Sequence, residues 1–145
     1  MNTLQVGFSR VNITPPLGVR LMGYFRKRLA EGVRDELEAN CICFACEDTK
    51  VVLISLDHLG VMRKVLNDLR EEIARTTGIP AEAVYIHSTH THTGPAVDPD
   101  AEAEVEQIYY KQFFRKVVDS AVLAMQDLKP AKMGYAVSTA PNIAY

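Results

Sequence analysis

The stretch KVVLISLDHLGVMRKVLNDLREEIARTTGIPAEAVYIHS, from Lys50 to Ser88, decides the fold. It opens with a continuous apolar run, which predicts a strand buried on both faces. From Met62 to Ile73, apolar residues recur at the i, i+3, i+4 and i+7 spacing of an amphipathic helix, and Gly78 and Pro80 end that helix. A short strand over 83–88 follows. Such a strand-helix-strand unit is right-handed in nearly all proteins, and its two strands are parallel.

The flanking segments extend this unit into a larger sheet. Residues 37–48 predict a strand that forms a hairpin with the first strand across the turn Asp48-Thr49. Residues 4–14 predict another strand, and the glycine-rich residues 15–35 predict an irregular connection. A long helix from about Ala101 to Leu128 and a last strand over 131–139 complete the chain. The predicted fold class is α/β, a mixed β-sheet flanked by helices and containing a right-handed βαβ unit, in one domain spanning residues 1–145.

Bulk composition narrows the function classes. A formal net charge of -2 and a pI near 6.1 give no reason to expect a nucleic-acid partner, which normally shows as clustered Lys and Arg. No stretch approaches the roughly 20 apolar residues of a transmembrane helix, and the first residues lack the character of a signal peptide. The sequence as written therefore predicts a cytoplasmic protein, or a secreted one if a leader has been removed.

Three cysteines, Cys41, Cys43 and Cys46, fall in one predicted strand. Their spacing suggests a metal site, but Cys41 and Cys43 would share one face of the strand while Cys46 points to the other. We expect small buried core residues, with metal or redox chemistry as the less favoured alternative.

Histidines are concentrated at one predicted edge of the sheet. His58 directly follows the first strand of the βαβ unit, His87 ends the second, and His90 and His92 lie just beyond it. Because the carboxyl ends of parallel strands meet at one edge, where open α/β sheets bind ligands, we expect all four histidines to gather there, together with Asp57.

His90 and His92 form an H-x-H pair, a spacing that projects both imidazoles to the same side of an extended backbone. Zinc suits such ligands and, when bound, lowers the pKa of its water to about 7. Asp57 would then be an acceptor that holds one histidine tautomer. Plain hydrogen-bonded loop residues are the competing interpretation, and it is the favoured one for His58 and His87.

The segment STHTHTGPA resembles the THTHSGP signature of the neutral/alkaline (non-lysosomal) ceramidase family. The resemblance runs in order through VGFSRVNITPPLGVRLMGY, GVRDELEANCICFACEDTKVVLISLDHLG and GIPAEAVYIHSTHTHTGPA, which is nearly the whole chain. It implies a zinc-dependent hydrolase that cleaves the amide bond of N-acylsphingosine with metal-activated water.

By this resemblance, His90 would be a zinc ligand, and His92 would stabilise the developing oxyanion or contact the substrate, although the two roles could be reversed. Gly23 matches a turn whose backbone faces the substrate. The family's other zinc ligands lie downstream of its signature, so the resemblance implies the amino-terminal portion of a longer catalytic domain with an incomplete site. The expected partner is a small-molecule or lipid amide, and self-association through exposed sheet edges is a further expectation.

Two other functions compete with this one. A non-catalytic domain that keeps the fold and binds a ligand or partner without metal accounts for the missing zinc ligands. A zinc hydrolase of the metallo-β-lactamase type would need H-x-H-x-D-H, and Gly94 and Pro95 stand where its Asp and His would be. No G-x-S-x-G elbow supports a serine hydrolase.

Overall fold

The computed structural model describes residues 3–141 and 143. Its main sheet has five strands in the order β6-β5-β4-β1-β7. Their bounds are β1 Gln5–Asn12, β4 Glu38–Cys46, β5 Thr49–Leu56, β6 Val84–Ser88 and β7 Lys129–Pro130. Two short strands, β2 Arg20–Leu21 and β3 Arg28–Leu29, pair separately. The helices are α1 Arg63–Thr77, the 3₁₀ turn η1 Ala81–Ala83 and α2 Glu104–Gln126.

The predicted α/β fold with a mixed sheet and a βαβ unit is confirmed. β5 and β6 pair in parallel around α1, while β4 is antiparallel to both β1 and β5. The β4–β5 hairpin turns at Glu47 and Asp48, with Glu47 at a φ of 51°. Helix α1 ends at Gly78, whose left-handed φ of 74° lets its N–H bond back to the Ala74 carbonyl, as the Gly-x-Pro signal predicts.

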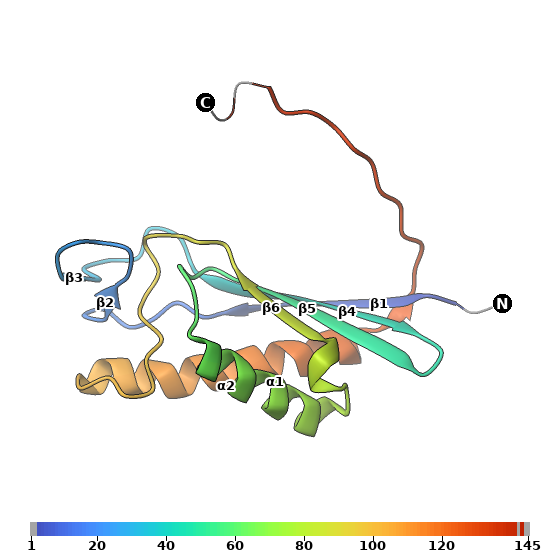
Figure 1. The fold of residues 1–145 in the computed structure, drawn as a ribbon, viewed down its shortest axis with the longest axis horizontal. Helices are drawn as coiled ribbons and strands as arrows, with labels where there is room; N and C mark the ends of the chain where they lie inside the picture. The colour runs from blue at the N-terminus through green and yellow to red at the C-terminus, as the bar shows by residue number, and fades with distance from the viewer. Residues whose placement is uncertain (1–2, 142, 144–145) are drawn as a thin grey trace.

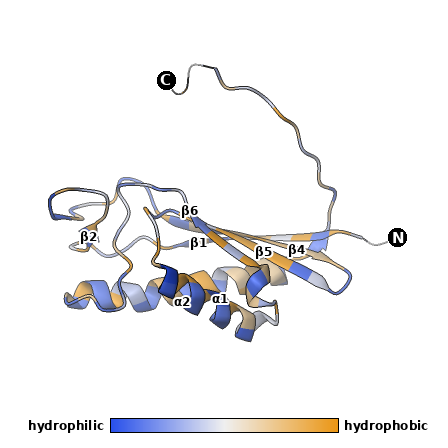
Figure 2. Cartoon of the chain, viewed as in Figure 1, coloured by the Kyte–Doolittle hydropathy of each residue, from blue (hydrophilic) through white to orange (hydrophobic). Residues whose placement is uncertain are grey.

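Both helices lie on one face of the sheet (Figure 1). α1 buries Val65, Leu69 and Ile73, and α2 packs beneath β1 and β4. Gly7 permits this close packing, because a Cβ there would overlap the carbonyl oxygen of Ala124 in α2. The core therefore fills the space between this helix-side face and the two helices (Figure 2).

The opposite face of the sheet, which we call the open face, is not covered by a helix (Figure 1). The prediction that β5 is buried on both faces is therefore wrong: Val52, Ile54 and Leu56 are buried, but Val51, Leu53 and Ser55 are not. Its continuous apolar run reflects one face that the helices cover and one that the described residues leave uncovered.

Side chains on the open face form rows across the strands. The registered pairs Phe8–Ile42, Ile42–Leu53 and Leu53–Tyr85 make one apolar row across β1, β4, β5 and β6. The row nearer the histidines is polar and consists of Arg10, Asn40, Ser55 and His87. The open face thus changes from apolar to polar toward the carboxyl ends of β5 and β6.

A second prediction, the strand over 131–139, is also wrong. Past β7 the backbone of residues 131–140 has no regular structure, and the segment arches away over the open face (Figure 1). The reason is register: β7 pairs with Gln5 and Val6 near the start of β1, so its next residues run past the end of their partner strand. The alternating Met133, Tyr135 and Val137 therefore stay exposed.

Cysteine placement follows the prediction. Cys41 and Cys43 are buried on the helix-side face, while Cys46 lies on the other face and is half-buried. Burial raises the pKa of the Cys41 thiol to about 12, which makes it unreactive at neutral pH. Among the described residues, no helix is both long and apolar enough to cross a bilayer.

Candidate functional site

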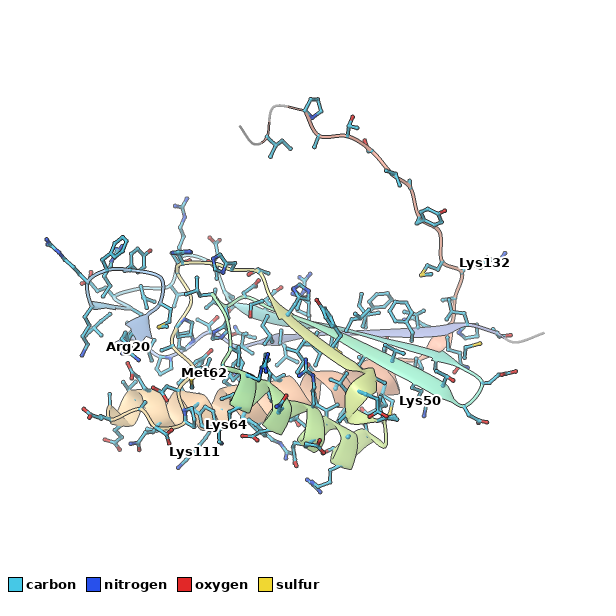
Figure 3. The ribbon with its side chains drawn as sticks, in the orientation of Figure 1. Arg20, Lys50, Met62, Lys64, Lys111 and Lys132 are labelled. Carbon is cyan, nitrogen blue, oxygen red and sulfur yellow. The ribbon has the colours of Figure 1, made fainter. Side chains whose placement is uncertain are left out.

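The loop after β6, residues 89–97, is held between two other segments at the carboxyl ends of β5 and β6. On one side Met22 donates to the Gly94 carbonyl and Ala96 donates to the Arg20 carbonyl, at 3.1 and 2.9 Å. On the other side the backbone N–H of Thr89 donates to the carbonyl of Leu56, the last residue of β5, and that of His90 donates to the His58 carbonyl in the turn after β5. In Figure 3, Arg20 marks this end of the molecule, and Lys50 lies toward the hairpin end. The predicted sheet edge therefore does assemble three segments distant in sequence.

His90 is fixed by its backbone and by its ring. Its φ of 66° is left-handed, a conformation that non-glycine residues rarely adopt. Its N–H donates to the His58 carbonyl at 2.9 Å, and its Nδ1 lies 2.9 Å from the Leu59 carbonyl. Because a carbonyl oxygen only accepts, Nδ1 carries the proton, and in the neutral ring Nε2 holds a free lone pair.

His92 has the same arrangement with a different acceptor. Its Nδ1 lies 3.0 Å from the carbonyl oxygen of Gly23, so this nitrogen also carries the proton. Gly23 has a φ of 86°, and a Cβ there would overlap the His92 ring. Only glycine allows the chain to turn this tightly against the imidazole. Gly23 thus contacts His92, and its predicted role toward a substrate stays a prediction.

The two imidazoles stand side by side, with ring centroids 5.2 Å apart and planes at 83°. Both rings are exposed, and neither Nε2 has a hydrogen-bond partner among the described residues. A donated Nδ1–H and a free Nε2 are what a metal-binding histidine normally shows, so the pair fits part of a zinc site. Residues 3–141 and 143 contain no group of three or more His, Cys, Asp or Glu placed to hold an ion.

The Asp57 carboxylate makes no hydrogen bond to either ring among the described residues. Its carboxylate accepts from the backbone N–H of Glu38 at 3.0 Å and from the Thr89 hydroxyl at 3.3 Å. The prediction that Asp57 holds a histidine tautomer is therefore wrong; backbone carbonyls do so for His90 and His92. Asp57 instead ties β4 to the first residue of the histidine loop. A catalytic role for it stays a prediction.

His58 and His87 do not join the pair, so the gathering of all four histidines is confirmed only for His90 and His92. The His58 ring is fully buried on the helix side and meets Phe113 of α2 edge to face, at 4.9 Å between centroids. Burial lowers the pKa of His58 to about 4. His87 lies exposed on the open face next to Tyr85. The structural interpretation favoured for both residues matches these positions.

Two features of the site have no sequence signal. The acceptor carbonyls belong to Leu59 and Gly23, and a carbonyl is present at every residue. Tyr109 hydrogen-bonds His58, although its spacing in α2 identifies it only as a core residue.

An aromatic and a cationic side chain lie beside His92. Tyr24 meets the His92 ring edge-on, with centroids 6.4 Å apart, and the Arg28 guanidinium lies 4.4 Å above the Tyr24 ring.

An open hollow of about 820 Å³ adjoins the histidine loop between the 27–37 segment and residues Asp57, Thr91 and Thr93. Its wall carries charged residues of both signs, namely Lys27, Arg28, Glu31, Arg34, Asp35, Glu36 and Asp57. Apolar side chains line it as well, among them Leu21, Leu29, Val33 and Leu37, so the wall is mixed in character.

Comparisons with known proteins identify related folds. No protein-family model matches the sequence, and neither does any curated protein. The fold matches the crystal structure of neutral ceramidase from Pseudomonas aeruginosa with a TM-score of 0.74 at 19% sequence identity. It matches a ceramidase complexed with C2 with a TM-score of 0.72, also at 19% identity. Each match covers 90% of this chain and 22% of the other, so the chain spans about a fifth of those ceramidases and shares the fold of that part.

Proposed function

We propose that this chain supplies part of the active site of a zinc-dependent hydrolase of the neutral ceramidase type, which cleaves an amide bond with metal-activated water. One observation carries the proposal: His90 and His92 each donate Nδ1–H to a backbone carbonyl and keep Nε2 free, with their rings 5.2 Å apart. The ceramidase-like fold, with this loop at its ligand-binding edge, supports it.

In this proposal His90 is the zinc ligand, through Nε2. Bound zinc would supply the activated water that attacks the amide carbonyl. The left-handed backbone of His90 and its two hydrogen bonds hold the ring before any ligand arrives, which lowers the entropy cost of binding. Asp57 supports this ring through Thr89, the preceding residue.

His92 has two possible tasks that its protonation state separates. Its Nδ1–H is already donated to Gly23, so only a protonated ring has an Nε2–H to donate to a developing oxyanion. A neutral ring instead offers a lone pair, either to the metal or to a proton. The charge of His92 in the working enzyme therefore decides whether His92 stabilises the oxyanion or binds the metal in place of His90.

We propose an amide as the substrate class and no particular amide. Catalytic zinc sites normally use three protein ligands, and the described residues offer two, so this chain needs further ligands from elsewhere. The hollow beside the pair is lined by both charged and apolar side chains, so it does not by itself select between a short polar and a long acyl group. Short polar amides should therefore be tested beside N-acylsphingosine.

A second candidate function is supported by the same observation, that the described residues offer two zinc ligands and not three. A domain that keeps this fold and binds a small ligand or partner without metal needs no third ligand and no complete active site. It predicts a well-folded chain that takes up no zinc.

Zinc uptake separates the two functions. The chain, purified without chelator, is dialysed against Zn²⁺ and its metal is measured by elemental analysis, together with a His90→Ala/His92→Ala double variant. His87→Ala is the matched control, because it removes an exposed histidine that lies away from the pair. We expect zinc uptake, with the remaining coordination positions filled by water or by a second copy of the chain, that the double variant loses and His87→Ala keeps. Equal uptake by all three proteins would contradict the proposal, and no uptake by the folded wild type would favour the non-catalytic domain.

A further inference from the structure

His58 is a buried histidine that the proposed chemistry does not use. It follows β5, and its side chain has no exposed surface. Its Nε2 lies 3.0 Å from the hydroxyl oxygen of Tyr109 in α2, and Phe113 packs against its ring. A polar ring in such a place normally makes a specific hydrogen bond, since an unpaired buried polar group is costly.

The direction of that hydrogen bond follows from the proton count. The Tyr109 hydroxyl has one proton and donates it to the Ile13 carbonyl at 2.8 Å. Tyr109 can therefore only accept from His58, so His58 carries its proton on Nε2. His58 Nδ1 is buried and makes no hydrogen bond of good geometry among the described residues, although the Pro95 backbone lies close enough to the ring to favour its protonated form. The bond from Nε2 to Tyr109 is therefore the well-formed hydrogen bond that anchors the ring.

This anchored residue lies directly behind His90. The His58 carbonyl accepts from the His90 N–H, and the next carbonyl, that of Leu59, accepts from His90 Nδ1. Both groups that hold His90 thus belong to the short turn that the His58 ring ties to α2. His92 takes its ring acceptor, the Gly23 carbonyl, from another segment. The turn meets the loop of His92 at Gly94, where an added Cβ would come close to the Asp57 carbonyl and the His58 Cα.

We propose that His58 is a positioning residue: its buried hydrogen bond to Tyr109 holds the 57–60 turn so that the Leu59 carbonyl keeps His90 in the Nδ1–H tautomer with Nε2 free. The inference rests on the proposed function only in the reason why a free Nε2 on His90 would matter. The tautomer itself can be measured without any metal. Outer partners of this kind commonly change metal affinity by about 10–100-fold when removed.

The test is a long-range ¹H–¹⁵N NMR spectrum of the metal-free chain at about pH 8, above the reference pKa of about 6.5 for imidazole in model peptides. The wild type should show His90 and His92 each as a single Nδ1–H tautomer. Tyr109→Phe keeps the aromatic ring and removes the acceptor for His58. We expect His90 to become a mixture of tautomers in this variant while His92 stays unchanged.

Two further variants separate positioning from general core damage. Phe113→Leu disturbs the packing around the His58 ring but leaves its hydrogen bond, so His90 should keep its tautomer. His58→Gln retains an N–H that can reach the Tyr109 oxygen and should preserve the His90 signal, whereas His58→Phe should lose it. An unchanged His90 in Tyr109→Phe and His58→Phe would overturn the inference, as would an equal change in His92.

Zinc titration of the same proteins keeps this inference distinct from the proposed function. If zinc binds, Tyr109→Phe should weaken its affinity by about 10-fold or more. An unchanged zinc affinity in that variant would overturn the positioning role. If the wild type binds no zinc while Tyr109→Phe still alters the His90 tautomer, the proposed function fails and the positioning role stands.

Discussion

The two faces of the sheet use similar residues in different ways. On the helix side, Ile54, Phe113 and the His58 ring are fully buried. On the open face, Phe8 and Tyr85 are each 56% exposed, although they belong to a continuous apolar row. Residue type therefore does not separate the faces; the presence of two helices does. We expect the helix side to carry most of the stability, and the open face and its loops to carry the adaptable chemistry.

Matched phenylalanines give the largest expected difference between the faces. Phe113→Ala leaves a cavity in the core and should lower the free energy of unfolding by about 3–5 kcal/mol. Phe8→Ala removes a ring that is more than half exposed and should cost about 1 kcal/mol or less. Urea unfolding followed by circular dichroism measures both. Equal losses would mean that the open face is covered in solution.

The histidines give the next difference, through pH. Burial lowers the pKa of His58 to about 4 in the folded chain, against 6.5 for the unperturbed group. The unfolded chain thus takes up a proton as pH falls below 6.5 and the folded chain does not until about 4. Stability is therefore lost as pH falls through this window, by about 3 kcal/mol in total, and is unaffected above it.

Two variants isolate this contribution from carboxylates that titrate in the same range. The loss of unfolding free energy between pH 7 and about 4 should be smaller in His58→Gln by about 3 kcal/mol, whereas His87→Gln, on the open face, should follow the wild type. If all three proteins showed parallel pH dependence, His58 would not be buried and neutral as described.

Two glycines sharpen the comparison within the loops. Gly18 and Gly23 have nearly equal left-handed φ angles, 88° and 86°, but a Cβ at Gly18 meets nothing within 4 Å while one at Gly23 overlaps the His92 ring. Gly18→Ala and Gly23→Ala should each cost about 1–2 kcal/mol of backbone strain. Only Gly23→Ala should shift the His92 imidazole signals in NMR. A comparable shift in Gly18→Ala would show that backbone strain alone moves the ring.

The smallest change in stability is expected on the apolar row itself. Phe8→Lys and Tyr85→Lys remove exposed apolar surface without opening a cavity, so unfolding free energies should change by about 0.5 kcal/mol or less. If the chain self-associates through its open face, and not through the sheet edges that the sequence led us to expect, light scattering should show less association in these variants. Unchanged association would place the contact elsewhere, for instance on the edge strand β6.

Several elements could be predicted from the sequence because their signals are local. The i, i+4, i+8 spacing of Val65, Leu69 and Ile73 and the helix end at Gly78 describe α1 without reference to the rest of the chain. The prediction of a strand over 131–139 was wrong because alternating apolar residues do not by themselves provide a partner strand. β7 pairs with the start of β1, so the residues after β7 lie past the end of β1. The prediction that β5 is buried on both faces was wrong because a continuous apolar run suits a strand that is covered on one face as well as one covered on both.

The site divides in the same way. The sequence alone placed His90 and His92 just beyond the end of a parallel strand. It also placed them close together, because a single residue, Thr91, separates them. It could not indicate which histidine nitrogen is free, because the acceptors are carbonyls of Leu59 and Gly23, 31 and 69 positions away. Only tertiary structure brings those carbonyls to the rings, and it turned His58 into the core toward Tyr109. A hydrogen-bond acceptor is chosen by distance in space, and the backbone offers one at every residue.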